Sequence, residues 1–228
     1  MSIFVIGDTH LSFSSQKPMT VFRGWDDYVS RIKENWQRLV TEQDTVIING
    51  DISWAMGLEE AKEDFSFLHS LNGEKIILKG NHDYWWNTVT KMEAFLKENE
   101  LTSIKFLYNN AYKIGDLAIA GSRGWFYDEE SEDSQRIILR ECGRLQRSID
   151  CAKQLGGELT VFLHYPPIAL GKSCPEILEV LEKNGVKRCF YGHLHGSAIR
   201  GAFNGVRNGV KYQLTSADYL EFCPLFVV

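Results

Sequence analysis

The chain has 228 residues, of which 44% are apolar and 24% are charged, as in an ordinary soluble globular protein. Its formal net charge is −5 and no Lys/Arg cluster is longer than a pair, which argues against a non-specific nucleic-acid binder. No segment approaches the ~18 consecutive apolar residues of a transmembrane helix. The length favours a single domain spanning residues 1–228.

The first residues and the cysteines bear on location. The chain opens with Met1-Ser2-Ile3-Phe4, which carries no basic segment, and the apolar run that follows is too short for a signal peptide. The five cysteines are widely spaced and form no CxxC pair, as expected of reduced thiols. We therefore expect a cytoplasmic protein without a membrane partner.

Short apolar runs alternate with helical patterns along the first hundred residues. Strands are predicted at 3–7, 45–49 and 75–79, and helices at 26–40, 59–70 and 87–99. This β-α-β-α-β order implies parallel strands joined by right-handed crossovers. The carboxyl ends of such strands meet at one edge of the sheet, where open α/β folds bind their ligands.

The second half continues with a hairpin and a longer helix. Strands at 112–114 and 117–120 are joined by Gly115-Asp116, a turn signal, and a helix is predicted at 133–155. Strands at 159–163 and 187–191 flank a helix at 175–184. From Ala198 onward the pattern indicates short strands with glycine turns.

Polar residues of a few types end several of these strands, and they include five of the six histidines. The groups, in chain order, are Asp8-Thr9-His10, Gly50-Asp51, Gly80-Asn81-His82-Asp83, His164 and Gly192-His193-Leu194-His195. Two divalent ions need a bridging anionic ligand, further nitrogen and oxygen ligands, and open positions for water and substrate. Asp, Asn and His supply that mixture, and the absence of thiolates argues against a closed structural zinc site.

Taken in order, these groups resemble the calcineurin-like metallophosphoesterase superfamily over most of the chain, from Asp8 to His195. The resemblance implies an α/β fold, a four-layer α-β-β-α sandwich of two mixed β-sheets flanked by helices. It also implies a phosphoric ester hydrolase with two divalent metal ions, manganese first, with iron and zinc as alternatives. The implied chemistry is attack on phosphorus by a dimetal-bound hydroxide.

The resemblance assigns roles to individual residues. Asp51 would bridge the two ions, and His82 would protonate the leaving oxygen without binding metal. Asp83 would tune or orient His82. The other implied ligands are Asp8, His10 and His195 for one ion, and Asn81, His164 and His193 for the second.

Each of these residues has an ordinary structural explanation when taken singly. Asp8, Asp51 and Asn81 suit turns after strands, and His164 suits a strand end before Tyr165-Pro166-Pro167. The joint occurrence of seven such residues in family order favours the metal site. For His69 the structural explanation prevails, because it falls in the last turn of a predicted helix.

The residue at position 54 indicates which subfamilies of this superfamily the chain does not resemble. Three residues after the bridging Asp, protein Ser/Thr phosphatases of this superfamily carry an Asp followed by Arg-Gly, and purple acid phosphatases carry a metal-binding Tyr. Trp54 occupies this position, which disfavours both and leaves open what supports His82 from that side.

The alternatives are a nuclease of the same superfamily and a non-catalytic binding scaffold with this fold. The acidic charge disfavours the nuclease, and the complete ligand set disfavours the scaffold. The expected partner is instead a small-molecule phosphoester, such as a nucleotide or a phosphodiester, because many aromatic residues lie in the site loops. Arg123, Trp86 and Trp125 are the predicted substrate-binding residues. The other aromatic residues near the motifs are Trp54, Tyr84, Trp85, Phe126, Tyr127 and Tyr165, and an acidic loop is predicted at 128–133.

Overall fold

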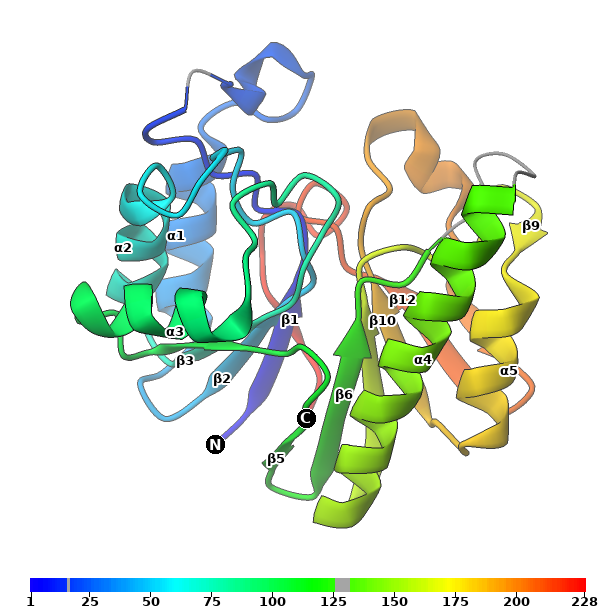
Figure 1. Cartoon of the computed structure of the whole chain (residues 1–228). Coiled ribbons are helices and arrows are strands. Elements are labelled where there is room, and N and C mark those ends of the chain that lie inside the picture. The colour runs from blue at the N-terminus through cyan, green and yellow to red at the C-terminus, as the bar shows by residue number, and fades with distance from the viewer. Residues whose placement is uncertain (16, 126–131) are drawn as a thin grey trace.

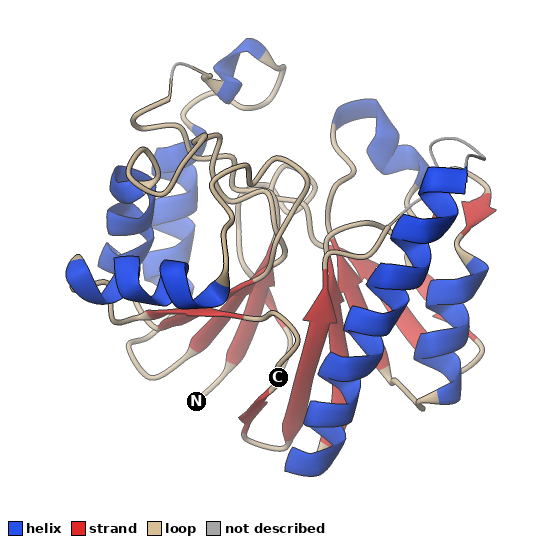
Figure 2. Cartoon of the chain, viewed as in Figure 1, coloured by secondary structure: helices blue, strands red, loops and turns tan. Residues whose placement is uncertain are grey.

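The computed structural model describes residues 1–15, 17–125 and 132–228. Two β-sheets lie face to face, and helices cover both outer faces (Figures 1 and 2). The strands of the five-stranded sheet, in spatial order, are β13 (Leu225–Phe226), β1 (Ile3–Ile6), β2 (Thr45–Ile48), β3 (Glu74–Ile77) and β4 (Ile104–Phe106). Those of the six-stranded sheet are β11 (Gly205–Arg207), β12 (Val210–Leu214), β10 (Arg188–Tyr191), β7 (Glu158–Leu163), β6 (Leu117–Ser122) and β5 (Tyr112–Ile114).

The helices form the outer layers. The first outer layer comprises α1 (Tyr28–Leu39), α2 (Lys62–Ser70) and α3 (Val89–Glu98). The opposite layer comprises α4 (Glu132–Leu155) and α5 (Pro175–Lys183). Smaller elements are the 3₁₀ helices Met19–Val21 and Gly196–Gly201, and the two-stranded ribbon of β8 (Ile168–Ala169) and β9 (Lys172–Ser173). No described helix is long and apolar enough to cross a membrane.

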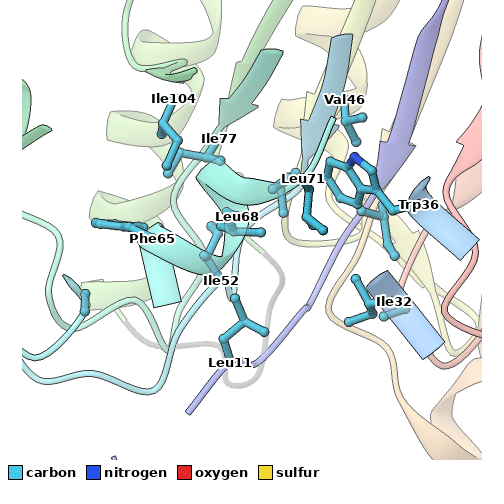
Figure 3. Close-up of a cluster of buried hydrophobic side chains, with 14 of the residues drawn as sticks. Leu11, Ile32, Trp36, Val46, Ile52, Phe65, Leu68, Leu71, Ile77 and Ile104 are labelled. Atoms are coloured by element: carbon cyan, nitrogen blue, oxygen red, sulfur yellow. The ribbon is translucent and has the colours of Figure 1, made fainter. Parts of the chain in front are cut away.

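Three apolar clusters hold the layers together. Between the sheets, β-branched and aromatic residues such as Val5, Ile47 and Phe162 are fully buried. A second cluster packs α1, α2 and α3 against the five-stranded sheet and includes Trp36 and Phe65 (Figure 3). A third packs α4 and α5 against the six-stranded sheet. This arrangement confirms the expected four-layer sandwich with two mixed sheets.

The direction of the strands determines where the polar motifs lie. The strands β1, β2, β3 and β4 are parallel to one another, as are β6, β7, β10 and β12. The polar motifs therefore follow the carboxyl ends of both sheets, where long loops gather (Figure 2). The strand β4 was not expected from the sequence, because Ile104-Lys105-Phe106 is too short to show a period.

Candidate metal centre

Unusual backbone conformations bring the polar motifs together. Asp8, His10, Asp51 and His193 have φ angles of 60°, 44°, 50° and 73°, in the left-handed region that non-glycine residues rarely adopt. Each such residue costs of order 1–3 kcal/mol, and such residues cluster at functional sites. These four are among the eleven described non-glycine residues with a positive φ, and all four are candidate ligands.

Two glycines allow the loops to approach closely. A Cβ atom on Gly80 would collide with the carboxylate and backbone nitrogen of Asp51, and one on Gly192 would collide with the carboxylate of Asp8. The glycines beside the ligands are therefore required by contact between loops from different strands.

Asp8, His10 and His195 form one group of potential metal ligands. Asp8 Oδ1 lies 3.3 Å from His195 Nε2, and His10 Nε2 lies 3.7 Å from Asp51 Oδ2. The carboxylate of Asp8 also accepts the backbone N–H of His193 at 3.0 Å, which holds it in place. All three candidate ligands predicted for the first ion are thus neighbours.

Asp51, His164 and His193 form the second group. His164 Nε2 lies 3.5 Å from Asp51 Oδ2. Asn81 Oδ1 lies 2.6 Å from His164 Nε2 and 2.9 Å from His193 Nδ1. Because Asp51 also faces His10 of the first group, it stands between the two groups as a bridging ligand would.

Outer partners orient two of the histidines. The Nδ1 atom of His164 lies 3.0 Å from the carbonyl oxygen of Asn49, which leaves its Nε2 directed at Asn81. The Nδ1 atom of His195 lies 2.9 Å from Asp218 Oδ1, which leaves its Nε2 directed at Asp8. Such contacts are the usual means of fixing the ring nitrogen that a metal binds.

Asp218 was not identified from the sequence. It follows β12 in Thr215-Ser216-Ala217-Asp218, and its second oxygen accepts the backbone N–H of Gly196 at 2.9 Å. The only available signal was its position after a strand, which it shares with the predicted ligands.

The carboxylate of Asp83 binds the backbone of two loops of the site. Its carboxylate accepts backbone N–H groups of Gly80, Asp51 and Ile52 at 2.7, 2.9 and 2.8 Å, and the indole N–H of Trp85 at 3.0 Å. The backbone N–H of Ser53 lies 3.3 Å from the same carboxylate, and none of these donors belongs to the His82 ring. Asp83 positions the loop of the bridging residue.

The buried titratable groups shift one another's pKa values. Burial lowers the pKa of His164 to about 3 and raises that of Asp51 well above its usual range. Burial also opposes charge on Asp8 and His195, but their mutual attraction outweighs it, lowering the pKa of Asp8 and raising that of His195 to about 10. A cation bound by both must displace the proton of His195, so its affinity falls at low pH.

The side chains fit divalent ions. The Nδ1 atom of His10 is buried without a hydrogen-bond partner among the described residues, and the Nε2 atom of His195 faces the Asp8 carboxylate at 3.3 Å. Ligand atoms at about 2.0–2.2 Å from a shared ion lie roughly 3–3.5 Å from one another. The 3.3 and 3.5 Å separations across Asp8–His195 and Asp51–His164 have this size.

His82 lies beside the two groups. Its ring centroid is 5.8 Å from that of His10 and 4.4 Å from that of Trp54, which stacks on His10 at 4.9 Å. Burial, followed by the charge of His193, lowers the pKa of His82. Trp54 therefore supports the His82 ring from the side that the sequence left open.

The chain matches the family of calcineurin-like phosphoesterases over residues 1–197. It belongs to this family. An uncharacterised protein of Methanocaldococcus jannaschii is 29% identical over 86 residues, a match that covers 36% of this chain and 46% of that protein. The chain thus matches about half the length of this curated relative.

Solved structures share the fold of this family member. Phosphopantetheinyl hydrolase of Mycobacterium tuberculosis aligns with a TM-score of 0.56 at 12% identity, over 100% of this chain and 95% of that one. A protein of unknown function from Aquifex aeolicus aligns with a TM-score of 0.51 at 15% identity, over 99% and 95% of the two chains. At these identities the likeness concerns the fold alone.

The predicted substrate-binding aromatic residues of this phosphoesterase-family chain are partly buried. Trp86 packs on the same apolar cluster as the buried Trp85, with the two ring centroids 5.3 Å apart. Trp125 packs against the α4–α5 layer, with Arg123 over its ring at 5.0 Å. Phe126, Tyr127 and most of the predicted 128–133 loop lie outside the described residues, and Glu132 and Asp133 begin α4.

Tyr84 is more exposed than either tryptophan chosen from the sequence. Its side chain is 51% exposed, and its Oη lies 3.5 Å from His82 Nδ1. His69, set aside as structural, lies in the last turn of α2 with Nδ1 2.8 Å from Ser103 Oγ. Tyr84 was among the aromatic residues near the motifs, but sequence alone did not separate it from its buried neighbours.

Proposed function

We propose that the protein is a dinuclear metal-dependent phosphoesterase that hydrolyses a small organic phosphomonoester or phosphodiester. The supporting observation is the pair of ligand groups that meet at Asp51 beside the ring of His82. Asp8, His10 and His195 would hold one ion, and Asn81, His164 and His193 the other. Divalent ions held at these positions would activate water and neutralise charge on the phosphoryl oxygens.

The chain's own residues orient the substrate and move a proton. The backbone N–H of His82 donates to Asp51 Oδ1 at 2.8 Å, so the His82 ring is held next to the bridging carboxylate. A phosphate group bound there favours the protonated ring, which donates its proton to the leaving oxygen. Trp54 packs against the His82 ring, with the two ring centroids 4.4 Å apart, and so holds the ring in place.

The small-molecule assignment rests on charge and on the site loops. The net charge of −5 is unfavourable for polynucleotide binding, which disfavours the nuclease alternative. Tyr84 offers an exposed ring beside His82 for a flat or apolar leaving group. Arg123, Trp86 and Trp125 are also proposed to contact the substrate. Both tryptophans are partly buried, so each would offer only part of its ring. The mycobacterial relative is named as a phosphopantetheinyl hydrolase, so a phosphopantetheinyl ester belongs in the substrate panel.

The test is metal reconstitution followed by a substrate panel. Metal-stripped protein would be reloaded with manganese, iron or zinc, because a mixed Asp/Asn/His site accepts each of them. Monoesters, diesters, nucleotides and cyclic nucleotides would then be assayed alongside elemental analysis. We expect hydrolysis only in reloaded protein, with maximal activity at two ions per chain. Full occupancy without hydrolysis of any ester would favour the binding scaffold.

A further inference from the structure

A small pocket lies next to the candidate metal centre but shares none of its ligands. It is lined in part by Lys79, Tyr108, Arg123, Glu141 and Arg144. These residues come from the loop after β3, the β4–β5 connection, the loop after β6 and helix α4. The pocket therefore joins both sheets and one outer helix.

The pocket adjoins the second ligand group. Lys79 precedes Gly80-Asn81 in the chain. The carbonyl oxygen of Arg123 accepts the backbone N–H groups of His164 and Tyr165 at 3.2 and 2.9 Å. A substrate whose scissile phosphate faces Asn81 and His164 would thus have this pocket within reach of a second group.

The charges of the pocket are unbalanced. Glu141, whose side chain is 1% exposed, is its single carboxylate, and it pairs with Arg144 Nη1 at 2.5 Å and lies 3.7 Å from Arg123 Nη2. Lys79 makes no hydrogen bond or ion pair within the described part of the chain. Three cationic groups against one carboxylate leave about two positive charges.

Arg123 retains free hydrogen-bonding capacity, and both arginines are held by aromatic rings. The Nε atom of Arg123 is buried without a partner among the residues that the structure describes. The Arg144 guanidinium lies over the ring of Tyr108 at 5.4 Å, and the Arg123 guanidinium over that of Trp125 at 5.0 Å, so both planes are held by aromatic rings. Planar guanidinium groups fixed in this way suit bidentate contact with phosphate.

We propose that this pocket binds a second phosphate group of the substrate. The inference rests on the proposed phosphoesterase function and narrows its substrates to esters that carry a second phosphate near the scissile one. A phosphate monoester carries a charge of about −1.5 to −2 at neutral pH, which matches the excess positive charge. A carboxylate, with one negative charge, would leave the pocket cationic.

The first experiment measures binding of inorganic phosphate to metal-stripped protein by calorimetry at constant ionic strength. We expect Lys79→Gln and Arg144→Gln each to weaken binding by about tenfold or more, since each variant removes a positive charge that would donate hydrogen bonds to phosphate. Glu141→Gln should strengthen binding, because it removes the opposing carboxylate. Arg147→Gln, on the exposed side of α4, is the matched control and should bind as the parent does.

If the Arg123–Glu141–Arg144 cluster only stabilises the fold, the substitutions should not change phosphate binding in this way. In that case phosphate would bind equally to the parent, Lys79→Gln and Glu141→Gln proteins, or to none of them, and either result would overturn the proposal. Lys79→Gln keeps the outcome interpretable if Arg144→Gln fails to fold, because Lys79 has no ion pair to lose.

The second experiment compares kcat/KM for adenosine 3′,5′-bisphosphate with the values for the 3′- and 5′-monophosphates, using manganese-loaded protein. We expect at least a tenfold preference for the bisphosphate, reduced toward one in Arg144→Gln. Metal-dependent hydrolysis of p-nitrophenyl phosphate without a preference for the bisphosphate would overturn the proposed second phosphate site and leave the proposed function intact. Charge-dependent phosphate binding without hydrolysis of any ester would support the pocket and overturn the proposed function.

Discussion

The two ends of the five-stranded sheet bury charged residues in opposite ways. At the amino end, Lys75 is fully buried, and its Nζ donates to the carbonyl oxygens of Leu71 and Gly73, both at 2.7 Å. Asp44, nearby, accepts the backbone N–H of Ser2 at 2.5 Å and both the N–H and hydroxyl of Thr41 at 2.9 and 2.7 Å. The charges at this end are satisfied by the chain itself.

At the carboxyl end, buried polar atoms are left without partners. His10 and Asp51 are buried in left-handed backbone, and His10 Nδ1 lacks a hydrogen bond within the described ranges. Because an unsatisfied buried polar group costs about 1–3 kcal/mol, its retention needs a reason. In this sheet, the charged residues whose hydrogen bonds are complete serve the fold. Buried polar atoms that lack hydrogen bonds, in residues with left-handed backbone, indicate a site for a ligand.

The largest expected effect separates the two ends directly. Asp51→Asn weakens the bridging ligand, and we expect loss of at least one of two ions per chain together with most of the activity. The matched variant at the other end, Asp44→Asn, should keep both ions and activity but lose about 1–3 kcal/mol of unfolding free energy. Elemental analysis and denaturant unfolding measure both quantities. Full metal content in Asp51→Asn would contradict the bridging role.

His82→Ala tests the residue that borders the site without being assigned as a ligand. Turnover should fall by about 10²–10⁴-fold on an ester with a poor leaving group, while metal content stays unchanged. The loss should shrink with p-nitrophenyl esters, whose leaving group needs little protonation. His69→Ala, on α2 away from the site, should retain turnover. An empty metal site in His82→Ala would show that the residue acts as a ligand.

Lys75→Met probes the charge at the amino end. Burial lowers the pKa of Lys75 to about 8 in the folded protein, against an ordinary value of 10.5. Between these pH values the unfolded chain binds more protons, so the folded parent gains stability as pH rises, by up to about 3 kcal/mol. Below pH 8 both states are protonated and the gain is absent. Urea unfolding at pH 7 and pH 10 should show that the free energy of unfolding rises with pH in the parent but not in Lys75→Met. The same pH dependence in both proteins would contradict the lowered pKa of Lys75.

The smallest effect concerns an outer partner of the site. Asp218→Asn keeps the shape of the contact to His195 but removes its charge, and we expect metal affinity to fall by about 10–100-fold. The free energy of unfolding of the metal-free protein should change by less than about 1 kcal/mol, because the amide oxygen of Asn can still accept one of the hydrogen bonds that Asp218 accepts. Competitive chelation measures the affinity, with Glu221→Gln as an exposed nearby control. Unchanged affinity would mean that His195 is oriented by other contacts.

Much of the layout could be predicted because it depends on local periodicity. The expected helix at 26–40 is α1 (Tyr28–Leu39), and the expected strand at 112–114 is β5 (Tyr112–Ile114). Apolar spacing along a helix or strand is set by the backbone repeat, so it is visible within a few residues. The same periodicity placed the candidate ligands at strand ends. Whether residues 1–228 form one domain, and which of these residues bind metal, stay predictions.

Tertiary structure decided every feature that depends on distant partners. The sequence by itself determined which residue types follow each strand, because these are read from neighbouring positions. It did not determine that His164 contacts the carbonyl of Asn49, 115 residues away, or that Asp83 holds the loop of Asp51. Nor did it reveal the pocket around Lys79 and Glu141. Such contacts depend on how two sheets and a helix pack, and no local pattern in the chain records that packing.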